Sequence, residues 1–293
     1  MSIKIFIDPG HGGSDRANKG PTGYVEADGV LKISLLLEKE LLATGAFTVG
    51  MSRRTDATVG LSARGKAAVN FGADLFISEH TNAGSSDARG TEVYYSVDIP
   101  GDKSLAASMS KAVSSALGIP DRGAKVRESQ NYPGEDYYTV IDIAQDGRIP
   151  HVLLVESAFH SNPQEEKLLK DEACLQKIAQ AQAKVICDFF GVTSVEALEA
   201  ALAKLSPKII TTTAYWKANA VPGKKVDGAY IQAVIRKYVS MFKKCNSYAD
   251  MVQYLVTAGI ISDPNYWKTN AIPGKTVDGG FAQTVLVRMA NKL

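Results

Sequence analysis

The segment KIFIDPGHGG, residues 4–13, is the most informative stretch of this chain of 293 residues. Its apolar run stops at Asp-Pro-Gly-His-Gly-Gly, which predicts a buried strand that enters a tight glycine turn with His11 at its tip. In α/β proteins, sites lie where strands end at their carboxyl side. We therefore expect His11 to face a cleft, with Asp8 orienting its ring through the second nitrogen.

The first part of the chain, residues 1–191, alternates between strand and helix patterns. Strands are predicted at 3–8, 47–51, 73–80, 91–97 and 151–156, and helices at 28–43, 61–71, 105–117 and 162–190. This alternation is typical of an α/β fold, with a mostly parallel twisted sheet covered by helices on both faces.

The remainder, residues 194–293, contains an internal repeat. YWKANAVPGKKVDG (215–228) returns as YWKTNAIPGKTVDG (266–279), an offset of 51 residues with 11 of 14 positions identical. We predict a small all-α domain of two repeats, about 194–244 and 245–293, which bury together what neither buries alone.

Composition argues against a membrane protein, a secreted precursor and a CxxC-based site. No run of about 18 apolar residues is present, so membrane insertion is not expected. The first residues already read as a core strand, so we expect synthesis in the cytoplasm without a signal peptide. The three cysteines are far apart and form no CxxC motif.

Charge is divided unequally along the chain. Residues 1–193 carry 20 basic and 25 acidic side chains, whereas residues 194–293 carry 13 and 6. The basic tail indicates an anionic partner, or lysines that keep a small helical domain soluble. The basic residues are spread out without a recognisable motif, which argues against nucleic-acid binding.

Three further residues are candidates for a site with His11. Glu26 precedes an apolar helix and, taken alone, is an acid favoured by the helix dipole, although Asp28 is the better cap. His80 ends a strand, and strand alternation points Glu79 to the opposite face. Glu156 ends a strongly apolar strand, where burial raises a carboxyl pKa and suits a general acid or base; the alternative is a salt bridge.

Two histidines, one carboxylate and a second free carboxylate form the pattern of a catalytic zinc site, with an open position for water. No GxSxG elbow is present, and no cysteine is placed near these histidines. His160 follows Glu156 near the same rim and is a candidate for substrate contact. His151 begins its strand at the far end, which favours a structural role.

Four motifs resemble one known family. They are DPGHGG (8–13), EAD (26–28), SEHTNA (78–83) and VESAFHSN (155–162). In this order, over about residues 2–190, they look like the zinc-dependent N-acetylmuramoyl-L-alanine amidases of the type-3 amidase family. The resemblance implies that His11, Glu26 and His80 bind one Zn²⁺ ion and that Glu156 is catalytic.

The resemblance also implies the reaction. It is hydrolysis of the amide between N-acetylmuramic acid and the L-alanine of the peptidoglycan stem peptide, by a zinc-activated water whose proton Glu156 passes to the leaving amine. We expect Asn82, His160 and Tyr137 to bind substrate, with Tyr137 in a loop, residues 129–138, near the cleft.

A catalytic domain followed by a repeat module is similar to bacteriophage endolysins that lyse Gram-positive hosts. The tail would then bind the cell wall, through an anionic secondary polymer and through Tyr215, Trp216, Tyr266 and Trp267. Aromatic residues at equivalent repeat positions are also typical of a core. Other interpretations are a bacterial sporulation or mother-cell-lysis amidase, an inactive wall-binding protein, and a tail that forms homo-oligomers.

Overall fold

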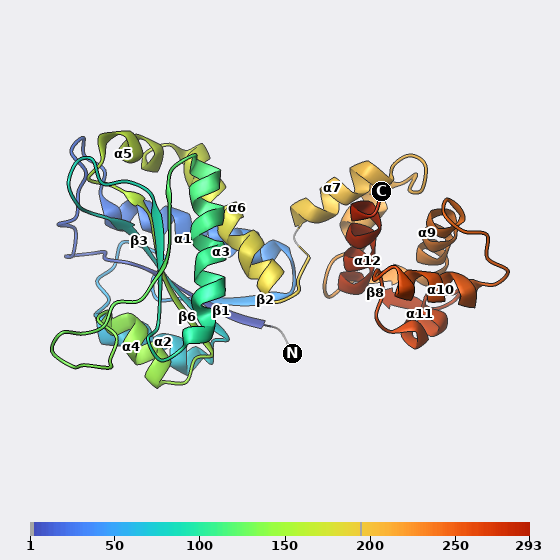
Figure 1. The fold of residues 1–293 in the computed structure, drawn as a ribbon, viewed down its shortest axis with the longest axis horizontal. Coiled ribbons are helices and arrows are strands. Elements are labelled where there is room, and N and C mark those ends of the chain that lie inside the picture. Colours follow the sequence, from blue (N-terminus) through green and yellow to red (C-terminus); the bar gives the residue numbers. More distant parts are fainter. Residues whose placement is uncertain (1–2, 194) are drawn as a thin grey trace. The chain divides into compact units, whose positions relative to one another are not determined.

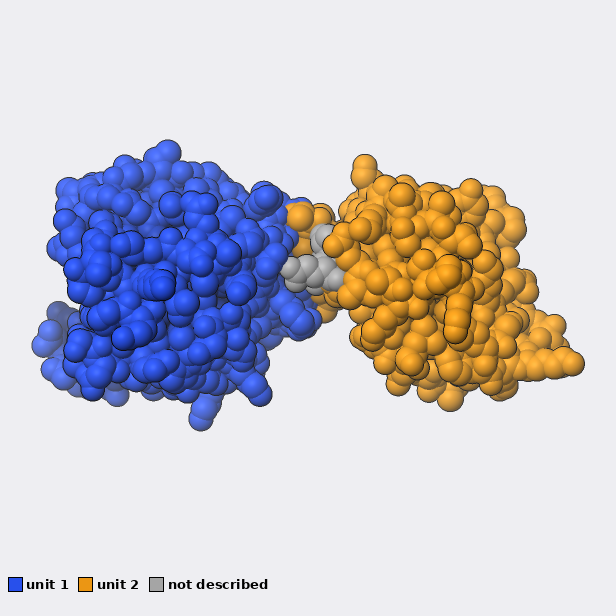
Figure 2. Space-filling view, turned by 90° about the horizontal axis from the view of Figure 1, so that it is seen from above, with its two compact units in different colours: residues 1–42, 47–189 blue, residues 43–46, 190–293 orange. Residues whose placement is uncertain are grey.

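The computed structural model describes residues 3–193 and 195–293, which form two compact units (Figures 1 and 2). The first unit comprises the chain up to Leu42 together with Phe47–Phe189, and the second comprises Ala43–Ala46 with Phe190–Leu293. Residues 1, 2 and 194, which include the expected start of the first repeat, lie outside the described residues. Within the described ranges, no helix is both long and apolar enough to cross a membrane.

A six-stranded sheet with the order β2-β1-β3-β6-β4-β5 forms the centre of the first unit. Its strands are β1 (Ile3–Pro9), β2 (Phe47–Met51), β3 (Leu75–Asn82), β4 (Thr91–Tyr95), β5 (Asp121–Lys125) and β6 (His151–Phe159). All neighbouring pairs are parallel except β4 with β6. The expected sheet is confirmed, and the carboxyl ends of β1, β3 and β6 meet at one edge.

Helices cover both faces of this sheet, as the alternation predicted (Figure 1). They are α1 (Glu26–Ala43), α2 (Leu61–Phe71), α3 (Lys103–Leu117), α4 (Thr139–Asp146), α5 (Pro163–Leu169) and α6 (Glu172–Phe189), with a 3-10 turn at Pro100–Asp102. One buried cluster joins α2 and α4 to the sheet, and another joins α1, α3 and α6 to its opposite face. Burial of these apolar faces is what fixes the layers.

Several expected boundaries were wrong. The first helix begins at Glu26, two residues earlier than predicted, and the helix expected over 162–190 is divided into α5 and α6. The division lies at Asp171, whose carboxylate accepts a hydrogen bond from the backbone N–H of Ala173 and so starts a new helix. Strand β6 continues three residues beyond Glu156. The short strand β5 and helix α4 were not predicted.

The second unit is helical, with a two-stranded ribbon in addition. Its helices are α7 (Val195–Leu205), α8 (Thr213–Asn219), α9 (Gly228–Ser240), α10 (Tyr248–Thr257), α11 (Pro264–Asn270) and α12 (Gly279–Asn291), and its strands are β7 (Lys225–Asp227) and β8 (Thr276–Asp278). Helix α7 packs on α12, and α10 packs on α9. One apolar core therefore spans both repeats.

The two repeats are joined reciprocally through this ribbon. Lys225 pairs with Asp278, and Asp227 pairs with Thr276. Two backbone hydrogen bonds repeat the relation, from the N–H of Gly228 to the carbonyl of Lys275 (2.8 Å) and from the N–H of Gly279 to that of Lys224 (2.9 Å). A shift of 51 residues exchanges the two partners in each case, which is the arrangement of a two-fold interface.

Candidate active site

His11 lies in a turn whose backbone is left-handed for three successive residues. The φ angles are 57° at His11, 113° at Gly12 and 60° at Gly13. Glycine adopts such angles without penalty, whereas a histidine there is strained. At Gly10 a Cβ atom would lie 2.3 Å from the His80 ring, so only glycine fits at this position beside His80.

Two buried arginines hold this turn. Arg53 donates from Nη2 to the carbonyl of Gly10 (2.6 Å), and Arg64 donates from Nη2 to the carbonyl of His11 (2.6 Å). Arg64 also pairs with the carboxylate of Asp8 (2.8 Å). These charge-assisted hydrogen bonds offset the energetic cost of the strained backbone. They also fix the backbone position from which the His11 side chain extends.

The expected role of Asp8 was wrong. Asp8 is fully buried and accepts hydrogen bonds from Arg64, Ser52 and Ser78. The residue that meets the second nitrogen of His11 is Asp15, whose Oδ2 lies 2.8 Å from Nδ1. Asp8 is still part of β1 and points toward Arg64 of α2, whereas Asp15 lies beyond the turn and can fold back toward the His11 ring.

The three predicted ligands converge. Glu26 is the first residue of α1 and is 1% exposed. Its Oε2 lies 3.3 Å from His11 Nε2, and its Oε1 lies 3.0 Å from His80 Nδ1. One ligand atom from each residue falls within 4.8 Å of the others. Asp28 is not the cap of the helix, since it lies within the first turn and pairs with Arg16.

Electrostatics reflect this proximity. Burial would raise the pKa of Glu26, but hydrogen bonds and charge interactions with His11 and His80 outweigh it and lower the pKa. Burial would lower the pKa of His11, yet Glu26 and Asp15 raise it to about 9. The Glu26 carboxylate thus favours positive charge on the neighbouring imidazoles. Two nitrogens and one carboxylate oxygen are a donor set that suits zinc.

Glu156 lies beside this cluster on the adjacent strand. It pairs in register with His80 of β3 on one side and with Glu92 of β4 on the other. Register partners point to the same face, so the three side chains form a row. The pKa of Glu156 is raised well above its usual value, first by burial and then by the charges of Glu26 and Glu92. Its Oε2 has no hydrogen-bond partner among the described residues.

The remaining predicted substrate residues occupy different positions. Asn82 donates to Glu92 Oε1 (2.8 Å) at the end of β3. His160 is 3% exposed, with Nδ1 3.0 Å from Thr81 Oγ1 and 4.0 Å from Glu26 Oε2, a position that favours support of Glu26 over contact with substrate. Tyr137 is half exposed, in the loop before α4.

This loop contacts β4 through residues that were not predicted from the sequence. The Arg127 guanidinium lies 3.5 Å from the ring centre of Tyr137, and Tyr138 packs against Tyr94. Burial raises the pKa of Tyr138, a hydrogen bond with Arg127 opposes this rise, and the charge of Glu156 adds to it. Tyr94 in turn donates to Glu92 Oε1 (2.8 Å). Only a motif match on β4 could have revealed Glu92 beforehand.

In the second unit, the aromatic residues divide by burial. Trp216 and Trp267 are each 4% exposed and belong to the shared core. Tyr215 and Tyr266 are half-buried, and each hydroxyl accepts a hydrogen bond from a backbone N–H, of Asp227 and Asp278 respectively (2.9 Å in both). The tryptophans thus serve mainly as core, while the tyrosines line the surface.

Comparison with known proteins accounts for the first unit. The family model for N-acetylmuramoyl-L-alanine amidases (Amidase_3) matches residues 5–188. The chain belongs to the N-acetylmuramoyl-L-alanine amidase family. Its first unit is therefore an amidase domain, as its four motifs suggested, and the tail lies outside the match.

Individual relatives of this amidase agree. The chain is 32% identical over 192 residues to the N-acetylmuramoyl-L-alanine amidase CwlM of Bacillus licheniformis, covering 65% of this chain and 70% of that protein. It is 29% identical over 184 residues to the sporulation-specific amidase of Bacillus subtilis, covering 62% and 66%. The crystal structure of an N-acetylmuramoyl-L-alanine amidase from Clostridium difficile 630 superposes with a TM-score of 0.58 at 27% identity, covering 65% of this chain and 97% of that one.

Proposed function

We propose that this amidase is a zinc enzyme that hydrolyses the bond between N-acetylmuramic acid and the L-alanine of the stem peptide. The observation that supports it best is the row formed by Glu156 next to His80, which itself meets His11 and Glu26. His11, Glu26 and His80 would hold the ion. When bound, zinc would supply Lewis acidity towards the substrate carbonyl and lower the pKa of a water molecule.

The chain's own residues would do the rest. Asp15 holds the His11 ring through Nδ1 and so leaves Nε2 for the ion. The backbone N–H of Thr81 and the amide of Asn18 both donate to the Glu26 carboxylate, which orients it. Glu156, with one oxygen unpaired, would accept the proton of the attacking water and return it to the departing amine, as a raised pKa allows.

This proposal is tested by alanine release from purified Gram-positive walls. Wild type should release new N-terminal alanine, and a chelator should abolish the release until zinc is restored. Glu156→Gln should bind zinc normally but lose activity by roughly a thousandfold. Glu172→Gln, which changes an exposed carboxylate elsewhere, should match wild type. Release that survives both chelation and Glu156→Gln would refute the mechanism.

We further propose that the protein acts as a bacteriophage endolysin, made in the host cytoplasm and reaching peptidoglycan when the membrane is permeabilised. The support is the attachment of a separate basic unit to an amidase domain, since a basic surface suits an anionic wall polymer. The alternative, a sporulation or mother-cell-lysis amidase, is supported by the likeness to the sporulation-specific relative.

Timing separates the two settings. Host cells that produce the full chain should stay intact until a holin or a pore-forming peptide opens the membrane, and should then lyse at once. If the cells instead stay intact after permeabilisation, and the enzyme degrades spore peptidoglycan but not vegetative walls, the sporulation role is correct.

A further inference from the structure

The second unit carries two surface pockets at equivalent places in its two repeats. The first pocket, of about 280 Å³, lies between α8 and α9 and includes Tyr215, Tyr230 and Lys237. The second pocket, of about 320 Å³, lies between α11 and α12 and includes Tyr266, Phe281 and Arg288. All ten residues that line the first pocket have their counterpart, 51 residues later, in the lining of the second.

Both pockets share an aromatic pair and a cation. The second also contains Asp263 where the first has Thr212, and the Asp263 carboxylate accepts hydrogen bonds from the backbone N–H groups of Asn265 and Tyr266. An exposed aromatic ring stands at the surface: Tyr230 is 55% and Phe281 is 54% exposed. Each packs edge-to-face on the neighbouring tyrosine, with ring centres 4.9 Å apart for Tyr215 and Tyr230 and 5.1 Å apart for Tyr266 and Phe281. Backbone N–H groups donate to the hydroxyls of Tyr215 and Tyr266, so these two rings are held in place before any ligand arrives.

A cation completes each pocket. Lys237 and Arg288 are exposed, and within the described part of the chain neither forms an ion pair with a carboxylate. Lys237 and Arg288 occupy equivalent positions, so both repeats carry a positive charge there. The preceding position, in contrast, changes from Arg236 to Val287. A core role does not require such a charge.

We propose that each pocket binds one acidic sugar unit of a wall-linked glycopolymer, and that the two pockets grip the same polymer. Sugar rings present C–H faces that pack on aromatic rings, while the cation meets the acidic group and the pocket size fits a single unit. This inference rests on the proposed function as a wall hydrolase. One shared core holds both pockets, with no flexible linker between them. Once one pocket has bound the polymer, the other would therefore meet a second sugar unit at high effective concentration.

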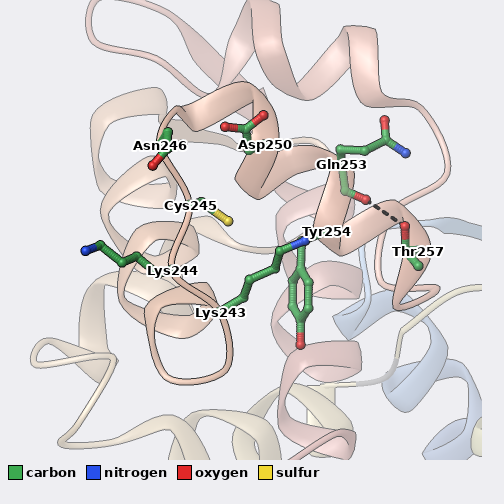
Figure 3. Close-up of a pocket in the computed structure, with 8 residues that line it drawn as sticks. All are labelled: Lys243, Lys244, Cys245, Asn246, Asp250, Gln253, Tyr254 and Thr257. Atoms are coloured by element: carbon green, nitrogen blue, oxygen red, sulfur yellow. Dashed lines mark hydrogen bonds between the residues drawn. The ribbon is translucent and has the colours of Figure 1, made fainter.

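Another cavity in this unit provides the control. Figure 3 shows the cavity at the loop before α10, where Lys243 extends toward Tyr254 and Thr257 bonds to the carbonyl of Gln253. In this part of the repeat the first copy carries two extra loop residues, so the offset is 53, and Gln253 and Tyr254 of α10 correspond to Ala200 and Ala201 of α7. The side chains that line this cavity are therefore not repeated in the first copy. Lys244 therefore allows an equal loss of charge outside the paired pockets.

The experiment measures binding of the full chain to purified walls, with Glu156→Gln present throughout to prevent digestion. Tyr230→Ala or Phe281→Ala alone should weaken binding roughly tenfold, and both together at least a hundredfold. Lys237→Gln should weaken it several-fold. The controls Phe242→Ala, which removes an exposed aromatic ring outside the pockets, and Lys244→Gln should bind as before. Unchanged tryptophan fluorescence would show that the variants fold.

Walls stripped of secondary polymer by hydrofluoric acid, which cleaves phosphodiesters, should lose binding. Retained binding to bare peptidoglycan would overturn the assignment of the ligand. If Lys244→Gln weakens binding as much as Lys237→Gln does, the loss reflects net charge and not the pocket. If the double variant changes the molar mass in light scattering, the pockets are contacts between copies and the proposal is wrong. Cleavage of a soluble muropeptide by the unmodified chain tests the amidase separately.

Discussion

Glu79 offers a quantitative test of how the sheet deals with a buried carboxyl group. It lies on the face of β3 opposite His80 and is fully buried. Gln182 donates to its Oε2 (2.9 Å), while Oε1 has no partner among the described residues. Burial, together with the charge of Asp8, raises the pKa of Glu79 to about 8.

The direction of the pH dependence follows from this pKa. An unfolded chain loses the Glu79 proton near 4.5, but the folded chain keeps it until about 8. Between these values the folded state binds more protons, so the free energy of unfolding falls as pH rises. At about 1.4 kcal/mol per unit of pKa difference, the loss reaches roughly 3 kcal/mol at pH 7.

Glu79→Gln removes the titration and keeps the shape. Near pH 4.5 the variant should match wild type, since glutamine resembles a protonated glutamate and its amide can donate to the unpaired Oε1 of Gln182. Its advantage should then grow with pH. Urea unfolding followed by far-UV circular dichroism measures the difference at each pH. Both tryptophans lie in the second unit, so their fluorescence gives an internal reference. A difference that stays constant with pH would refute the reasoning.

Three more predictions concern the proposed metal site and the turn that carries His11. Gly10→Ala should weaken zinc binding at least tenfold, since its Cβ would displace the His80 ring, whereas Gly60→Ala, with open space and φ of −66°, should leave zinc titrations unchanged. Arg64→Met should destabilise the first unit by about 3–5 kcal/mol in urea unfolding, because it leaves a buried carboxylate unpaired; a loss under 1 kcal/mol would contradict this. Zinc affinity should rise roughly tenfold per pH unit up to about 9, because His11 must release a proton; calorimetry in buffers of different ionisation enthalpy should detect that proton, and its absence would count against the pKa.

Much of this site was predictable from sequence because its residues end strands or start a helix. His11, His80 and Glu156 follow apolar runs, and a parallel sheet brings such ends to one edge. Glu26 needed the family resemblance, since an acid at a helix start has an ordinary explanation. The direction of Glu79 followed from strand alternation alone.

The missed residues act through tertiary contacts that leave no local pattern. Arg53 and Arg64 bind backbone carbonyls of a turn more than 40 residues earlier, and no motif marks them. Asp15 replaced Asp8 because backbone direction after a left-handed turn cannot be read from spacing. Strand β5 is mostly polar and lies at the sheet edge, so it lacks the apolar run that reveals a central strand.

The reciprocal pairing of β7 with β8 has a consequence for how the tail is put together. Helix α7 packs on the last helix of the other repeat, and α10 does the same in return. Each repeat therefore contributes its first helix to the packing of the other repeat. The same arrangement would result if two copies of a homodimeric peptide had been fused into one chain. Deleting one repeat would therefore not leave half a tail. It would leave a repeat whose share of the common core is exposed, and a second copy of the same repeat would be the surface that fits it.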